Sequence, residues 1–410
     1  MEQTYYIIIM SALVGEYLLS TASSILNMKN ISPNIPDEFK DVYDEEKYKK
    51  SQDYLKINTR FGLGTGAFGL LLIMGVIHTD FFGYVDQWVR LQTDHFILQG
   101  LFFFFLLFIA KDIISLPFSI YSTFVIEEQF GFNRTSVKTF ITDLIKGYAL
   151  TLVLGSIILS PILYFFEIYQ TNGWWIAWSI LTVFMIAIQP LFVHVISPMF
   201  NTFTPLEDGA LKNAIDAFSK KVQFPIARID VMDGSKRSSH SNAYFTGFGK
   251  SKRVALYDTL MDDHSEDEII SIVAHEVGHY KKKHIIKGTI LGILETGLML
   301  FIFNLIKNDQ ALYSVFGVEN MSVYAGLLFF GMLYTPVSLV LSIFTTALSR
   351  KNEFEADAFA KEHTQNPQAL ISMLKGLAAR NLSHLSPHPM TVFLSYSHPP
   401  VSQRIEAIKQ

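Results

Sequence analysis

The chain contains no cysteine among its 410 residues. This absence excludes disulfide bonds, thiolate metal sites and cysteine nucleophiles, so any bound metal must be held by nitrogen and oxygen. Charged residues are also scarce, at 17% of the sequence against 50% hydrophobic residues. No arginine-rich tract is present, and we therefore expect no nucleic-acid partner. This balance differs from that of ordinary soluble proteins.

The hydrophobic residues form runs that are long enough to cross a bilayer, which takes about 20 residues in a helix. The runs cover Tyr5–Ile25, Phe61–Ile77, Phe96–Leu116, Leu144–Phe166, Trp174–Met199, Ile285–Ile306 and Val323–Leu348. The first run is not typical of a cleaved signal peptide, because its flank MEQ carries no basic residue and Glu16 interrupts it. We therefore expect seven membrane helices.

Basic residues alternate along the chain between rich and poor connections. The first, third and fifth connections and the tail after Leu348 are rich in Lys and Arg, whereas the second and sixth have only Arg90 and Lys307. Since basic connections stay on the cytoplasmic side, we expect an outside amino terminus and a cytoplasmic carboxyl terminus. The predicted organisation is five membrane helices with cytosolic loops (1–200), a cytosolic segment (201–284), two further membrane helices (285–348) and a cytosolic tail (349–410).

The cytosolic segment 201–284 has the signals of a small α+β unit. An amphipathic helix is followed by three extended segments, ARIDVMD, NAYFTGF and KRVALYD, which are separated by turn residues. Ser265 and Glu268 then form the pattern of a capping box and predict the start of a helix. That helix carries the motif HEVGH.

The motif HEVGH places His275 and His279 on one helix face, where both can bind a single ion. Glu276 would lie beside the metal and could take a proton from a metal-bound water. The alternative is a surface helix with two unrelated histidines. The helix cap and the small residues Ala274 and Gly278 favour the metal site.

A third ligand is expected because catalytic zinc takes three protein ligands and one open position. The segment SRKNEFEADAFAKEH, which is predicted to be helical, offers Glu353, Glu355 and Asp357. Glu353 and Asp357 share a face, so we assign Glu353 as the ligand and Asp357 as an acceptor that orients a ligand histidine. The alternative is a solvated acidic face. We expect one Zn²⁺ per chain and a structural role for His284.

The motifs together resemble those of the zinc-dependent integral-membrane CaaX prenyl proteases, the type I CaaX endopeptidase family. The resemblance covers nearly the whole chain, through YSTFVIEEQFGFNRT, SNAYFTGFGKSKRVALYDTL, HEVGHYKKKH, SRKNEFEADAFA and SHPPVSQR. The middle and late motifs are shared partly with smaller heat-shock membrane proteases. The FGFNRT segment and the seven spans are not, and they favour the CaaX family.

The resemblance implies roles for individual residues. His275, His279 and Glu353 would be the metal ligands and Glu276 the base. His398 would face the substrate carbonyl, with Arg404 near it, and either could stabilise developing negative charge. An alternative for His398 is a capping or loop residue. A strand that lines the cleft would pair with an extended substrate through Asn242, Ala243, Tyr244 and Phe245.

The implied fold is a mainly α-helical polytopic membrane protein, with seven helices around a chamber and a cytosolic α+β metalloprotease domain as its cap. The implied reaction removes the last three residues from a prenylated CaaX peptide. The alternatives are a general quality-control protease for unprenylated membrane proteins, and a transporter with a structural zinc site. We expect peptide substrates, lipid-modified ones included, membrane lipids as further partners, and a monomer. Its membrane would be the endoplasmic reticulum or a bacterial inner membrane.

Overall fold

The structure is a computed structural model that describes residues 1–246 and 253–410. Within this part of the chain, seven helices are long and apolar enough to cross a membrane, which confirms the predicted number. They are α1 (Glu2–Lys29), α2 (Glu45–His78), α4 (Phe96–Tyr121), α5 (Val137–Ile168), α6 (Gly173–Leu191), α11 (His284–Ile306) and α13 (Val323–Thr364). Turns of π-helix at Ser122–Glu127 and Phe192–Ile196 extend α4 and α6, and α7 (Ser197–Phe200) completes the latter. Each predicted run lies inside one of these segments.

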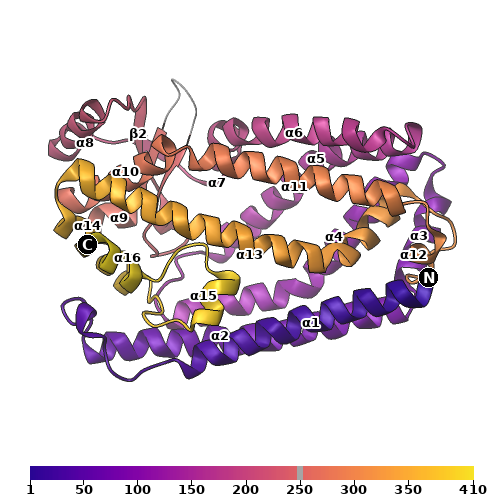
Figure 1. The fold of residues 1–410 in the computed structure, drawn as a ribbon, viewed down its shortest axis with the longest axis horizontal. Coiled ribbons are helices and arrows are strands. Elements are labelled where there is room, and N and C mark those ends of the chain that lie inside the picture. The colour runs from indigo at the N-terminus through magenta and orange to yellow at the C-terminus, as the bar shows by residue number, and fades with distance from the viewer. Residues whose placement is uncertain (247–252) are drawn as a thin grey trace.

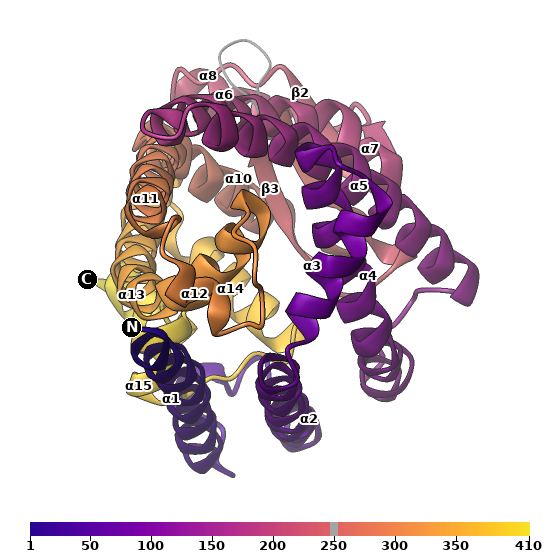
Figure 2. The ribbon, with the colours of Figure 1, turned by 90° about the vertical axis from the view of Figure 1, so that its right-hand side faces the viewer.

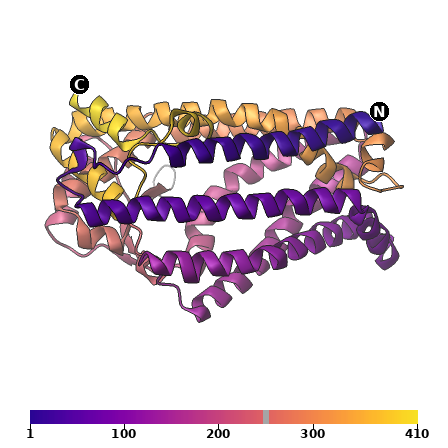
Figure 3. The ribbon, with the colours of Figure 1, turned by 90° about the horizontal axis from the view of Figure 1, so that it is seen from below.

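The seven helices form a ring (Figures 1 and 2). Direct contacts join α1 to α2, α4 to α5, α5 to α6, α6 to α11, α11 to α13 and α13 back to α1. Phe68 of α2 packs against Phe118 of α4 at 5.2 Å between ring centroids, which closes the circle. In Figure 3, α1 and α2 lie side by side along the long axis of the molecule.

The ring exposes large apolar side chains in a way that suits lipid and not water. Leu71, Val183 and Phe344 are 69%, 67% and 68% exposed, and each belongs to a different helix of the ring. Extensive exposed apolar surface marks contact with a membrane or a partner. Together with the length of the helices, this confirms a polytopic membrane protein.

Two short helices, α3 (Phe81–Gln92) and α12 (Gln310–Ser314), lie at the end of the ring that holds the amino terminus. Buried Asp86 of α3 accepts a hydrogen bond from the hydroxyl of Tyr324 at 2.6 Å and pairs with Arg90 at 2.8 Å. Gly83 is required here, since a Cβ would lie 2.1 Å from the carbonyl oxygen of Gly317.

The opposite end carries a four-stranded sheet, and the three predicted extended segments form three of its strands. The strands are β1 (Phe203–Pro205), β2 (Arg228–Met232), β3 (Ala243–Thr246) and β4 (Arg253–Tyr257). Their order is β1-β2-β4-β3, with β2 and β4 parallel and the other pairs antiparallel. β3 therefore lies at one edge of the sheet.

Helices surround this sheet and bury a common core. They are α8 (Ala210–Lys221), α9 (Asp258–Asp263), α10 (Glu266–Lys281), α14 (Pro367–Arg380) and α16 (Val401–Lys409). Helix α15 (Pro389–Ser395) lies outside this core and contacts α13 and α1 instead. The core joins side chains from segments far apart in the sequence, among them Phe218, Leu256, Val273, Phe359 and Leu374. The carboxyl-terminal half of α13 enters this core, so one helix connects the ring of membrane helices with the end that carries the sheet (Figure 1).

Candidate metal centre and active site

The site is built where α10 and α13 cross. The predicted capping box is present, with the hydroxyl of Ser265 accepting from the backbone N–H of Glu268. Helix α10 buries Val273 and Val277 in the core on one face. On its other side Gly278 meets α13 closely, because a Cβ there would lie 3.1 Å from the Cα of Ala356. This approach brings the two histidines of α10 to the acidic residues of α13.

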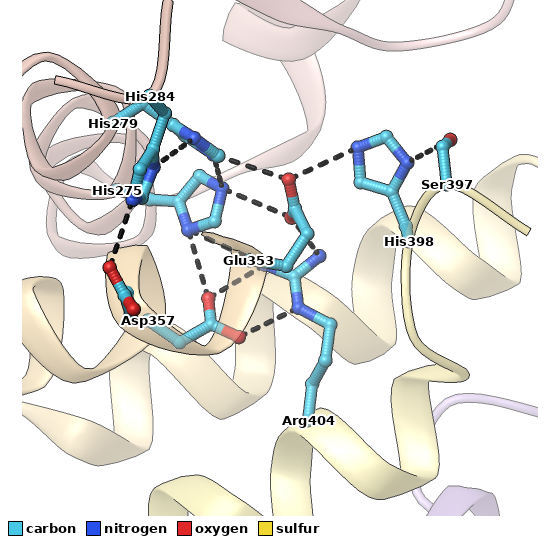
Figure 4. Close-up of polar contacts among 9 residues, drawn as sticks. His275, His279, His284, Glu353, Asp357, Ser397, His398 and Arg404 are labelled. Carbon is cyan, nitrogen blue, oxygen red and sulfur yellow. Dashed lines mark hydrogen bonds and ion pairs between the residues drawn. The ribbon is translucent and has the colours of Figure 1, made fainter. Parts of the chain in front are cut away.

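His275, His279 and Glu353 converge, with donor atoms that all lie within 4.8 Å of one another. The two Nε2 atoms of the histidines are 3.0 Å apart, and Glu353 oxygens lie 3.4 Å from His275 Nε2 and 3.2 Å from His279 Nε2 (Figure 4). Glu353 Oε2 is buried and has no hydrogen-bond partner. Two imidazole nitrogens and a carboxylate facing one point form a donor set that fits a divalent metal ion.

A buried network of ion pairs fixes the orientation of His275 through its Nδ1 atom. Its Nδ1 donates to Asp357 Oδ1 at 2.9 Å, which is the contact an orienting carboxylate makes. Asp357 in turn accepts from Arg404 Nε at 2.7 Å and from Nη2 at 2.6 Å. Arg404 Nη1 also lies 3.4 Å from Glu353 Oε2. Arg404 is thus engaged by two carboxylates and lies buried beneath the ligands.

His279 has an orienting partner that the sequence reasoning missed. Its Nδ1 shares a hydrogen bond of 3.0 Å with Nδ1 of His284, and His284 Nε2 contacts Glu355 Oε2 at 3.1 Å. His284 is therefore not one of the three convergent donors, yet it connects His279 to a second carboxylate on α13. Each histidine of α10 thus has its own support from α13.

The charge balance at His275 can be assigned to its neighbours. Burial alone would lower the pKa of His275, but hydrogen bonds to Asp357 and Glu353 outweigh this effect and raise the pKa to about 9. The carboxylates of Asp357 and Glu353 likewise raise the pKa of buried Arg404 against the opposing effect of desolvation. The carboxylates of Asp357 and Glu353 thus favour positive charge at this point of the site, which is the condition that a bound cation needs.

Two further predicted residues lie near the ligands. Glu276 is half-buried on α10, and its negative charge acts on Arg404. His398 approaches Glu353 from the side opposite His275 and His279, with its Nε2 3.4 Å from Oε1 (Figure 4). Its side chain is 63% exposed, and its Nδ1 contacts the hydroxyl of Ser397 at 2.9 Å. His398 is thus the accessible polar group of this cluster.

The predicted substrate strand corresponds to β3, preceded by Asn242. The side-chain oxygen of Asn242 accepts from the N–H of Ala243 at 2.8 Å, and the backbone carbonyl of Asn242 accepts from the N–H of Tyr257 at 3.1 Å. Tyr244 pairs with Ala255 on β4, and α10 contacts β3. The side chain of Phe245 lies outside the described residues. β3 is therefore an edge strand in contact with the helix that carries His275 and His279.

A ring of seven membrane helices with this donor set defines an integral-membrane metalloprotease, and comparisons with known proteins agree. Residues 24–202 match the family model of the CAAX prenyl protease N-terminal region with five membrane helices, and residues 205–410 match peptidase family M48. The chain belongs to peptidase family M48, in the group that carries this CAAX prenyl protease N-terminal region.

The relatives are similar over nearly their full length. CAAX prenyl protease 1 of Saccharomyces cerevisiae is 35% identical, covering 91% of this chain and 88% of the relative. The human CAAX prenyl protease 1 homolog is 31% identical, over 92% and 89% of the two chains. The crystal structure of S. mikatae Ste24p superposes with a TM-score of 0.91, at 34% identity and over 98% of both chains.

Proposed function

We propose that this chain is a zinc endopeptidase that removes the carboxyl-terminal tripeptide from prenylated CaaX peptides. The observation that supports it is the convergence of His275, His279 and Glu353, next to Glu276, at the end of a ring of membrane helices. The names of the relatives, CAAX prenyl protease 1, agree with this substrate class.

Zinc suits the donor set because two imidazoles and one carboxylate leave a fourth position for water or substrate. A cysteine that could close that position is absent from the sequence. When bound, zinc would polarise the scissile carbonyl and make a water molecule acidic enough to lose its proton near neutral pH. His275, His279 and Glu353 would hold it.

The protein's own groups would then divide the work of hydrolysis. Glu276 would accept the proton from the attacking water and return it to the leaving amine. His398, exposed on the side of Glu353 away from the two histidines, would donate to the oxyanion of the tetrahedral intermediate. The donors of Arg404 face Asp357 and Glu353, so we assign Arg404 to orienting these carboxylates in place of direct contact with substrate.

The substrate would bind in two parts. Its peptide would add to β3 as an extended strand, with main-chain hydrogen bonds supplied by residues 242–245. The ring of helices would enclose a chamber for the lipid of a prenylated cysteine. We also infer that the metal centre faces the cytoplasm, that the enzyme acts as a monomer, and that its membrane is the endoplasmic reticulum. The cytoplasmic assignment is supported by the basic connections at that end.

The experiment that tests the substrate class compares one CaaX peptide in prenylated and unprenylated form. The purified protein should release the terminal tripeptide from the prenylated peptide, as detected by mass spectrometry, and turn over the unprenylated peptide much more slowly. Equal turnover of both forms would favour general proteolysis of membrane proteins.

A further inference from the structure

His398 lies on a short connection between two helices. Residues 396–400 separate α15 from α16, and Pro399 and Pro400 at the end of this connection are buried. Proline restricts the backbone angle φ, so the connection has little freedom on the α16 side. Where His398 points therefore depends on how firmly α15 and α16 are held.

Arg350 of α13 holds the end of α15 that is nearest to His398. Its Nη1 donates to the carbonyl of Val392 at 2.9 Å and to that of Tyr396 at 2.7 Å. The Val392 carbonyl also accepts from the backbone N–H of Tyr396 at 3.3 Å, and a cation beside the carboxyl end of a helix is favourable. Arg350 therefore caps α15 two residues before His398.

Arg404 holds α16 to the same helix α13, through its two hydrogen bonds to Asp357. Along α13, Arg350 precedes Glu353 by three residues and Asp357 follows Glu353 by four. Both attachment points thus flank the metal ligand within about one turn of helix. Because α15 and α16 are both attached close to Glu353, the connection between them places His398 so that it faces Glu353 (Figure 4).

The far end of α15 is anchored without Arg350. The side chain of His388 accepts from the N–H of Met390 at 3.2 Å, and Asn27 of α1 accepts from the N–H of His388 at 2.9 Å. The hydroxyls of Ser23 and Thr391 make a further contact of 2.9 Å. Loss of Arg350 would therefore free the His398 end of α15 and leave the helix attached to α1.

We propose that Arg350 is a positioning residue for hydrolysis, which fixes His398 toward the reacting carbonyl by tying the end of α15 to the ligand-bearing helix. This inference rests on the proposed function, in which His398 donates to the oxyanion. Arg350 touches neither the ligands nor the substrate in this account. Its effect passes through the placement of His398.

The test is a double-mutant cycle with R350M and H398A. We expect R350M to keep its zinc and its KM and to lose roughly 10- to 100-fold in kcat, because small displacements of a reacting group cost on this order. The variant R350M/H398A should be no slower than H398A alone, since the two changes remove the same interaction. R350K, which keeps a cationic donor, should recover part of the loss.

The matched control is K351M, which removes a positive charge from the next residue of α13. Lys351 is 71% exposed, and its Nζ lies 3.8 Å from Glu355 in a weak surface ion pair. Removal of the Lys351 charge should therefore leave kcat unchanged. Full activity of R350M, or losses that multiply in the double variant, would overturn the positioning role. Full activity of H398A would instead refute the oxyanion role of His398, and with it this inference. If R350M does not retain zinc, the same cycle with R350K decides between these outcomes.

Discussion

At the scale of single residues, the site is defined by what each buried charge contacts. Glu276 differs from its neighbours His275 and His279 because it is not among the three donors that converge. Its adjacent place on the helix suits a proton acceptor and not a ligand. Replacement of Glu276 should therefore affect cleavage, whereas replacement of Asp357, which orients His275, should affect metal binding.

We expect Glu276→Gln to retain zinc and to lose peptide cleavage by about 10²- to 10⁴-fold, the range typical of a general acid–base group. Zinc content by atomic absorption and cleavage by mass spectrometry would be measured on the same preparation. Glu266→Gln is the control, since Glu266 is exposed in the first turn of the same helix. Undiminished cleavage by the Glu276 variant would remove it from the mechanism.

For Asp357→Asn we expect the opposite pattern, a loss of metal affinity of about 10- to 100-fold, as is usual for a partner of a ligand histidine. Asp357 is 2% exposed and bonds both His275 and Arg404, so the neutral amide also removes one of the two carboxylates that pair with the buried guanidinium. Zinc competition with a chelator of known affinity measures the change. An unchanged zinc affinity would show that His275 is oriented without Asp357.

At the scale of elements, the helices and the sheet differ in how far the sequence predicts them. The apolar runs predicted all seven membrane helices, because each run is long and needs no partner to be recognised. β1 was missed, since it has three residues and includes Pro205. The support of His279 by His284 was missed as well. Lys283 adopts φ 60° between α10 and α11, and this reversal, which no pattern indicates, turns His284 back toward His279.

The edge strand β3 gives a prediction about the substrate backbone. Strand addition uses N–H groups of alternate residues of the bound peptide. N-methylation of a peptide amide that pairs with β3 should therefore raise KM strongly, while methylation of the neighbouring amide should have little effect. A series of singly methylated CaaX peptides with measured KM values tests this. A uniform response along the series would contradict binding by strand addition.

At the scale of the whole molecule, one long helix relates the membrane to the chemistry. Helix α13 runs from Val323 to Thr364, so the apolar span predicted to end at Leu348 and the acidic segment with Glu353 form a single rod. The sequence identified both parts. It could not show how α10 would meet them, because that crossing depends on the tertiary fit of Gly278 against Ala356. Because Glu353 lies on α13 beyond its apolar span, this helix places the candidate metal centre at one face of the membrane.

The proposed cytoplasmic position of the candidate metal centre can be tested with single cysteines, because the chain has no cysteine of its own. Asn172, in the connection between α5 and α6, and Glu362, near the carboxyl end of α13, are both exposed and lie at opposite ends of the ring. With an impermeant maleimide applied to sealed membrane vesicles whose cytoplasmic side faces inward, we expect labelling of Asn172→Cys alone. Glu362→Cys should react only after permeabilisation. The reverse pattern would place the metal centre outside the cytoplasm and exclude cytosolic CaaX proteins as its substrates.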